Sequence, residues 1–225
     1  MKKRIKLADR ILPRYSKGEE VMNMVTHTVG GGLGILVLLL CMAKAGFHGR
    51  WPALLSAIIY GASMIALYTI SSVYHGLHPN TGKKVLQVLD HCTIYVLIAG
   101  TYTPIAVCAF IPGHPVLGFG LLILEWGLGA LAITLTAIDL KKYNVFSMIC
   151  YIGMGWAILP FLKLTRELLT PPGFILLLSG GIAYTIGAIL YGIGSKVRWM
   201  HSVFHIFVVL GSVLQFLSIY LYVLP

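Results

Sequence analysis

Residues 199–224 read WMHSVFHIFVVLGSVLQFLSIYLYVL, an apolar run that contains two histidines four positions apart. Side chains at i and i+4 of a helix point in the same direction, so His201 and His205 lie one turn apart on one face. Histidine is costly to desolvate without a partner. These residues are therefore either hydrogen-bonded core histidines or a pair that holds a ligand, and the rest of the chain decides which.

Apolar residues dominate the whole chain. Of its 225 residues, 58% are hydrophobic and 11% are charged, and the mean hydropathy is +0.87. A soluble domain carries about 25% charged residues, so this chain cannot cover a globule with polar surface. Apolar runs long enough to cross roughly 30 Å of hydrocarbon as helices occupy residues 23–43, 53–76, 88–110, 116–138, 145–162, 173–193 and 199–222.

These runs predict the fold class. They are continuous and lack the alternation of strands in a membrane barrel. We therefore expect an all-α membrane protein: a seven-transmembrane-helix bundle over residues 23–225, preceded by a basic segment at 1–22. The four cysteines show no paired spacing, which favours free core residues, although a disulfide between Cys41 and Cys108 stays open.

The basic residues are distributed unevenly along the chain. Thirteen of the 17 Lys and Arg residues lie in segment 1–22 or in the loops after the second, fourth and sixth runs, and four lie in the other loops. The positive-inside rule then predicts a cytoplasmic N-terminus and, with seven spans, an extracellular C-terminus. The basic excess therefore reflects topology and indicates no nucleic-acid partner. Segment 1–22 either lies on anionic lipid headgroups or serves only as an orientation signal.

Ionisable side chains inside a membrane are costly and usually face an interior cavity or a partner. Those within or at the edge of the runs are His27, His75, Asp90, His91, Glu125, Asp139, His201 and His205. The order of the spans places His75 at the cytoplasmic end of its run. Asp90 and the His201–His205 pair lie near the beginning of their runs, and both of these runs start on the cytoplasmic side. Three helices thus bring four polar side chains to one depth.

This set of side chains predicts zinc. Three neutral imidazoles match a zinc site whose fourth position is left for water. Thiolates are missing from the set, and it is not the all-oxygen set that calcium or magnesium prefers. Asp90 either ligates directly or accepts a hydrogen bond from the bound water as its base. Ser71, one turn before His75, is placed to hydrogen-bond within the cluster.

Three further ionisable residues within the runs are His91, His27 and Glu125. His91 follows Asp90 directly and points about 100° away from it on a helix, so we interpret it as a structural partner. His27 is either a fourth polar group lining the site or a packing residue. Glu125 lies near the middle of its run and is a candidate to mark a cavity.

Four motifs carry a family resemblance. EEVMNMVTH (19–27), SSVYH (71–75), LDHCTIYVLIAGTYTP (89–104) and HSVFHIFVVLG (201–211) resemble the signatures of the hemolysin III family of bacterial membrane proteins. That family is related to the progestin and adipoQ receptors, including the adiponectin receptors, and more distantly to the alkaline ceramidases. The resemblance implies a seven-helix protein of the bacterial plasma membrane with zinc near the cytoplasmic face. Its implied ligands are His75, His201 and His205, with Ser71 and Asp90 in supporting positions.

Two classes of function remain open. In the first, the protein is a zinc-dependent hydrolase of an acyl lipid or amide that acts in membrane-lipid homeostasis, with Asp90 as the base and zinc or Ser71 stabilising the oxyanion. In the second, it is a non-enzymatic membrane sensor or a cytolysin, and zinc is structural. A polar centre among tightly packed helices favours lipid chemistry over a pore, which needs a polar lumen.

Overall fold

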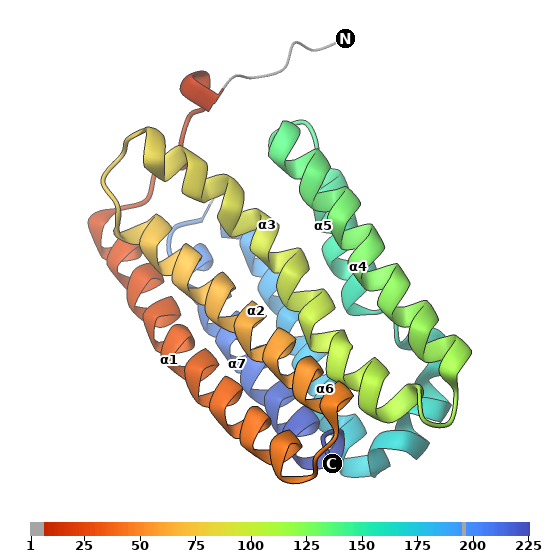
Figure 1. Cartoon of the computed structure of the whole chain (residues 1–225). Helices are drawn as coiled ribbons and strands as arrows, with labels where there is room; N and C mark the ends of the chain where they lie inside the picture. The colour runs from red at the N-terminus through yellow and green to blue at the C-terminus, as the bar shows by residue number, and fades with distance from the viewer. Residues whose placement is uncertain (1–6, 195–196) are drawn as a thin grey trace.

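The computed structural model describes residues 7–194 and 197–225 and is helical throughout, with no strand among these residues (Figure 1). The α-helices are α1 (Lys17–Phe47), α2 (Trp51–Gly76), α3 (Thr81–Pro104), α4 (Pro115–Ile138), α5 (Asn144–Gly155), α6 (Leu162–Gly194) and α7 (Met200–Tyr222). Shorter turns are η1 (Leu7–Asp9), the π-helical η2 (Ile105–Phe110) and η3 (Leu159–Phe161). The all-α prediction is confirmed.

Short loops make successive helices run in opposite directions (Figure 1). α1 packs against both α2 and α7, α2 packs against α3, and α6 packs against α7. Helices α4 and α5 lie together at the edge of the bundle opposite α1 (Figure 1). The first described residues and the C-terminus lie at opposite ends of the bundle (Figure 1). Helices α1 and α7, the first and last of the chain, are thus neighbours.

The outer surface of the bundle is apolar. Large hydrophobic side chains such as Ile123, Val29 and Leu39 are more than half exposed. By length and composition, six helical stretches among the described residues are able to cross a membrane, with Asn144–Gly194 counted as one stretch. The protein is therefore an integral, multi-pass membrane protein whose exposed face is solvated by lipid.

Helices α1 and α2 approach closely because glycines face the partner helix. A Cβ atom on Gly30 would lie 2.4 Å from the ring of Tyr68, and one on Gly61 would lie 2.6 Å from the Cα of Leu38. Small residues allow this kind of contact between membrane helices. The Gly30 contact lies one turn beyond His27, so it fixes the spacing of the two helices near the polar end of the bundle.

The run predicted at 145–162 is not one continuous helix. Helix α5 ends at Gly155, and the chain passes through η3 before α6 begins at Leu162. Pro160 lies inside η3, and a proline supplies no backbone N–H and disfavours a helical residue before it. The Tyr102 hydroxyl stabilises the break: it donates to the Gly155 carbonyl (3.0 Å) and accepts from the Ile158 amide (3.2 Å).

Helix boundaries differ from the prediction at two other places. Helix α6 begins well before residue 173 and is kinked at Thr170 (φ 60°, ψ 160°), because Pro171 follows it. Helix α1 begins at Lys17, inside the predicted segment 1–22, because Ser16 and Glu19 form a capping box. The first turn of α1 therefore belongs to the bundle. All four cysteines are free, so no disulfide joins Cys41 to Cys108.

Candidate metal centre

Three histidines from two helices meet at one end of the bundle. His75 is the second-last residue of α2, and His201 and His205 occupy the first two turns of α7. Their potential ligand atoms all lie within 4.8 Å of one another, and the three side chains are buried. The sequence predicted that these residues share a depth; the structure also turns them toward one another.

The distance between two of the histidines is close to that of a tetrahedral metal site. The Nε2 atoms of His201 and His205 are 3.1 Å apart, and two nitrogens of a tetrahedral zinc site are roughly 3.3 Å apart when each bond is about 2.0–2.1 Å. The Nε2 of His75 is buried and has no hydrogen-bond partner among the described residues. A buried polar atom without a partner needs an explanation, and a metal shared with the other two imidazoles supplies one.

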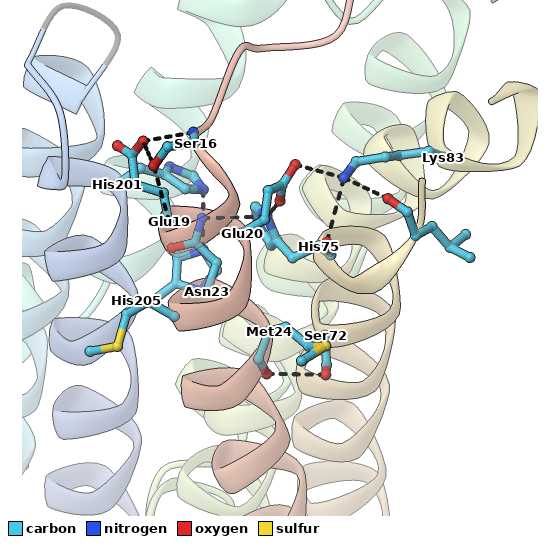
Figure 2. Close-up of polar contacts among 12 residues, drawn as sticks. Ser16, Glu19, Glu20, Asn23, Met24, Ser72, His75, Lys83, His201 and His205 are labelled. Atoms are coloured by element: carbon cyan, nitrogen blue, oxygen red, sulfur yellow. Dashed lines mark hydrogen bonds and ion pairs between the residues drawn. The ribbon is translucent and has the colours of Figure 1, made fainter. Parts of the chain in front are cut away.

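The carboxylate of Glu20 contacts the ring of His75 through Nδ1 (Figure 2). Oε2 of Glu20, on α1, lies 2.6 Å from Nδ1 of His75, and its Oε1 accepts from the Lys83 ammonium at 2.7 Å. The amide nitrogen of Asn23 lies 3.4 Å from the same Nδ1. Hydropathy did not point to Glu20, because this residue lies in the segment predicted to be outside the bundle. The i, i+3, i+7 spacing of Glu20, Asn23 and His27 could have indicated its role, since it places all three on one helix face.

The neighbouring carboxylate holds the start of α7. Oε1 of Glu19 accepts the backbone N–H of Trp199 at 2.8 Å, and its Oε2 accepts from the backbone and hydroxyl of Ser16. Trp199 has a left-handed backbone (φ 68°), which costs energy for a residue with a bulky side chain. The Glu19 contact therefore stabilises the turn that leads directly into His201 (Figure 2).

A cavity of about 190 Å³ opens beside the histidines. Its polar end includes Ser71, Asp90, His201 and His205, and Tyr15 lies at the same end. The remaining lining is mostly apolar and continues to the break after α5, including Ile94, Leu97, Ile98, Trp156, Leu177 and Val208. The predicted residues Ser71 and Asp90 thus share a cavity with two of the histidines. Asp90 lies outside the group of close ligand atoms, which consists of histidines alone among the described residues.

His27 is a polar lining group. Its ring stacks on that of His205, with centroids 3.7 Å apart and an interplanar angle of 20°, and it meets Tyr68 edge-on. It lines the cavity, is 3% exposed, and neither ring nitrogen has a hydrogen-bond partner among the described residues. Both interpretations from sequence describe part of its position, since His27 lines the cavity and also packs against the rings of His205 and Tyr68.

His91 lines the same cavity, whereas Glu125 does not. His91 is hydrogen-bonded through Nδ1 to the Gln87 carbonyl (2.8 Å) and through Nε2 to the Tyr191 hydroxyl (3.2 Å), as expected for a structural partner. Glu125 is fully buried in α4, but the cavity lining does not include it. Its position therefore does not mark this cavity.

Tyr15 covers the polar end from the N-terminal side. Its ring stacks on His201 with centroids 4.8 Å apart, and it also contacts the ring of His75 at 5.7 Å. Burial raises the pKa of its phenol well above the usual range. Nothing in the sequence singles out Tyr15, because it precedes the first predicted span.

The fold and the site define a multi-pass helical membrane protein with a buried group of three histidines able to hold a metal. A family model described as "Haemolysin-III related" matches residues 15–216, and the chain belongs to that family. The predicted resemblance is thereby confirmed.

Relatives in bacteria and animals agree with this assignment. The chain is 38% identical to Hemolysin-3 of Bacillus cereus over 207 residues, covering 92% of this chain and 93% of the relative. It is 36% identical to the Hemolysin-3 homolog of Bacillus subtilis (strain 168) over 204 residues, covering 91% and 94%. It is 25% identical to the human Monocyte to macrophage differentiation factor over 179 residues, covering 75% and 70%. No solved structure matches the chain significantly.

Proposed function

We propose that this protein is a zinc-dependent hydrolase of an acyl lipid, with an amide or ester as the scissile bond, acting in membrane-lipid homeostasis at the bacterial plasma membrane. One observation carries the proposal: two histidines of the group, His201 and His205, line a cavity that is otherwise mostly apolar, inside a membrane bundle. An acyl chain fits the apolar part, and its carbonyl group would then lie at the histidines. Polar chemistry at the end of an apolar pocket is the usual form of a small-molecule site.

His75, His201 and His205 are the proposed ligands. All three offer a ring nitrogen as ligand, and the group contains no thiolate or carboxylate, a set that suits zinc. Bound zinc supplies Lewis acidity: it polarises a carbonyl oxygen and activates water near neutral pH. The protein's part is to hold three ligands and leave the fourth position open toward the cavity.

Asp90 and Ser71 carry the proposed proton chemistry. Both line the cavity together with His201 and His205. Asp90 accepts the proton of the water that attacks the carbonyl carbon, and it returns that proton to the leaving amine or alcohol. The Ser71 hydroxyl donates to the oxygen that becomes negative during the attack. Because Asp90 lies outside the group of ligand atoms, the role of base fits it better than that of ligand.

We also propose the membrane topology. The chain crosses seven times, with α5 and η3 forming the fifth span and α6 the sixth; the N-terminus is cytoplasmic and the C-terminus extracellular. Two observations support this: the two ends of the described chain lie at opposite ends of the bundle (Figure 1), and thirteen of the 17 Lys and Arg residues lie on the proposed cytoplasmic side. The histidine group then lies near the cytoplasmic face.

The Asp90→Asn variant tests the proposed function. It keeps the size and polarity of the side chain but removes the base. Purified protein in lipid nanodiscs is assayed against a panel of fluorescent acyl amides and acyl esters, and zinc content is measured on the same samples. We expect Asp90→Asn to retain zinc and lose at least 100-fold in turnover, in the range that general-base catalysis contributes. Hydrolysis at the wild-type rate by Asp90→Asn would rule out this mechanism.

A structural role for the metal is the second candidate. The histidine group joins α2 to α7, two helices far apart in the sequence, as a structural metal site would. Under this alternative, the protein is a membrane sensor or a cytolysin, and hemolysin is the name its Bacillus relatives carry. Zinc removal would then lower stability, and neither the wild type nor Asp90→Asn would hydrolyse any member of the panel.

A further inference from the structure

We propose that Glu20 is a positioning residue of the metal centre: its carboxylate fixes the tautomer and the ring orientation of His75. The proposal rests on the zinc site put forward above. Glu20 lies in the first turn of α1, on a different helix from all three histidines, and its Oε2 is 2.6 Å from Nδ1 of His75. A distance this short is typical of a charge-assisted hydrogen bond.

The contact decides which nitrogen of His75 carries the proton. An ionised carboxylate only accepts hydrogen bonds, so Nδ1 of His75 is the donor in the 2.6 Å contact with Glu20. In this tautomer the longer 3.4 Å contact to the amide nitrogen of Asn23 joins two donors and is not a hydrogen bond. In a neutral imidazole the proton on Nδ1 leaves a lone pair on Nε2, and Nε2 is buried with no partner among the described residues. Glu20 therefore directs a free lone pair toward His201 and His205. A carboxylate behind a ligating histidine also raises its basicity, which strengthens metal binding.

Lys83 keeps the carboxylate in place. Its ammonium, on α3, donates to Oε1 of Glu20 at 2.7 Å and to the Leu77 carbonyl at 2.9 Å, so it also contacts the chain just after α2 ends (Figure 2). Lys83 is buried, and a buried charge needs a partner of opposite sign. With both oxygens engaged, Glu20 cannot turn away from His75. The position of one zinc ligand is thus determined jointly by α1, α2 and α3.

Glu167 provides the matched control. It is an exposed carboxylate in the first part of α6, at a distance from the histidines. Glu19, the neighbour of Glu20, is not suitable as a control, because it accepts from the backbone of Trp199 and so supports the turn before His201.

The experiment measures zinc affinity of the full-length protein by competition with a chromogenic chelator, and the visible absorption spectrum of the cobalt-substituted protein. The variants are Glu20→Gln, Glu20→Ala and Lys83→Met, with Glu167→Gln as the control. We expect Glu20→Ala to weaken zinc binding about 10- to 100-fold. Glu20→Gln should weaken it less, because the amide oxygen still accepts from Nδ1. The cobalt bands should shift in both Glu20 variants and stay unchanged in Glu167→Gln.

The possible outcomes separate this inference from the proposed function. Wild-type protein that takes up no zinc overturns both. Wild-type protein that binds zinc, together with Glu20 variants of unchanged affinity and cobalt spectrum, overturns only the role of Glu20. A loss of affinity in Glu167→Gln as large as in Glu20→Ala would also overturn it, because the effect would then not depend on the contact with His75. If Glu20→Ala does not fold, Glu20→Gln decides.

Discussion

Buried polar side chains occur in two very different settings in this bundle. At the end formed by the starts of α1 and α7 and the end of α2, each carboxylate has several partners: Glu20 contacts His75 and Lys83, and Glu19 contacts Trp199 and Ser16. In α4, on the other side of the bundle, Glu125 is fully buried and neither of its oxygens has a hydrogen-bond partner among the described residues.

The difference shows what makes a polar site in a membrane protein. A single buried carboxyl group adds a desolvation cost and organises nothing around it. At the histidine end, α1, α2, α3 and α7 each contribute a side chain or a backbone group, so both carboxylates of α1, Glu19 and Glu20, are compensated and His75 is held in place. Convergence of several helices, rather than polarity alone, identifies the functional end of this protein.

Removing two of the three histidines should have the largest effect. We expect wild-type protein to contain about one zinc per chain and the His201→Ala, His205→Ala double variant to contain none, because one imidazole cannot hold the ion. Metal analysis of purified protein checks this, and Glu125→Gln is the matched control from the other side of the bundle. Full zinc content in the double variant would show that the metal, if present, lies elsewhere.

The orientation of the two ends is tested by a fusion. A reporter that is active only in the cytoplasm, placed after Pro225, should give no signal, because the proposed topology puts that end outside. The same reporter fused after Leu135 should be active, since the second half of α4 approaches the cytoplasmic side in that topology. A strong signal after Pro225 would place the histidine end on the outer side of the membrane.

The packing that supports the histidine end is tested at Gly30. An Ala side chain there would place its Cβ 2.4 Å from the ring of Tyr68, so α1 and α2 must separate. We expect Gly30→Ala to destabilise the protein by about 1–3 kcal/mol, the usual cost of overpacking, and to lower the midpoint of thermal unfolding in detergent. Gly32→Ala is the control, because nothing lies within 4 Å of that Cβ position. Equal midpoints for the two variants would contradict the tight α1–α2 contact.

The smallest effect is expected at Glu125. The Glu125→Gln variant keeps the shape of the side chain, and no described hydrogen bond is lost. We therefore expect the free energy of unfolding to change by less than the about 1–3 kcal/mol expected for Gly30→Ala, and the zinc content to stay unchanged. Thermal unfolding and metal analysis check both. A loss of zinc in Glu125→Gln would show that the buried carboxyl group in α4 is coupled to the histidine end of the bundle.

Sequence alone determined the helical class and the depth of the three histidines. In hydrocarbon every backbone polar group must be satisfied within the chain, so long apolar runs leave only helices. Depth then follows from counting runs, which is why His75, from the end of one run, and His201, from the start of another, were predicted at one level. The zinc prediction needed no more than this depth and the spacing of His201 and His205.

Only the tertiary structure decided which residues support the histidines and where the helices are interrupted. The rotation of a helix about its own axis is set by packing against its neighbours, so the stacking of His27 on His205 could not be predicted from sequence. Glu20 and Tyr15 precede the first apolar run, where hydropathy carries no information about burial. The end of α5 at Gly155 depends on the Tyr102 hydroxyl, which lies on a different helix. Hydropathy reports the solvent around a helix, whereas contacts between helices select the partners of each polar atom.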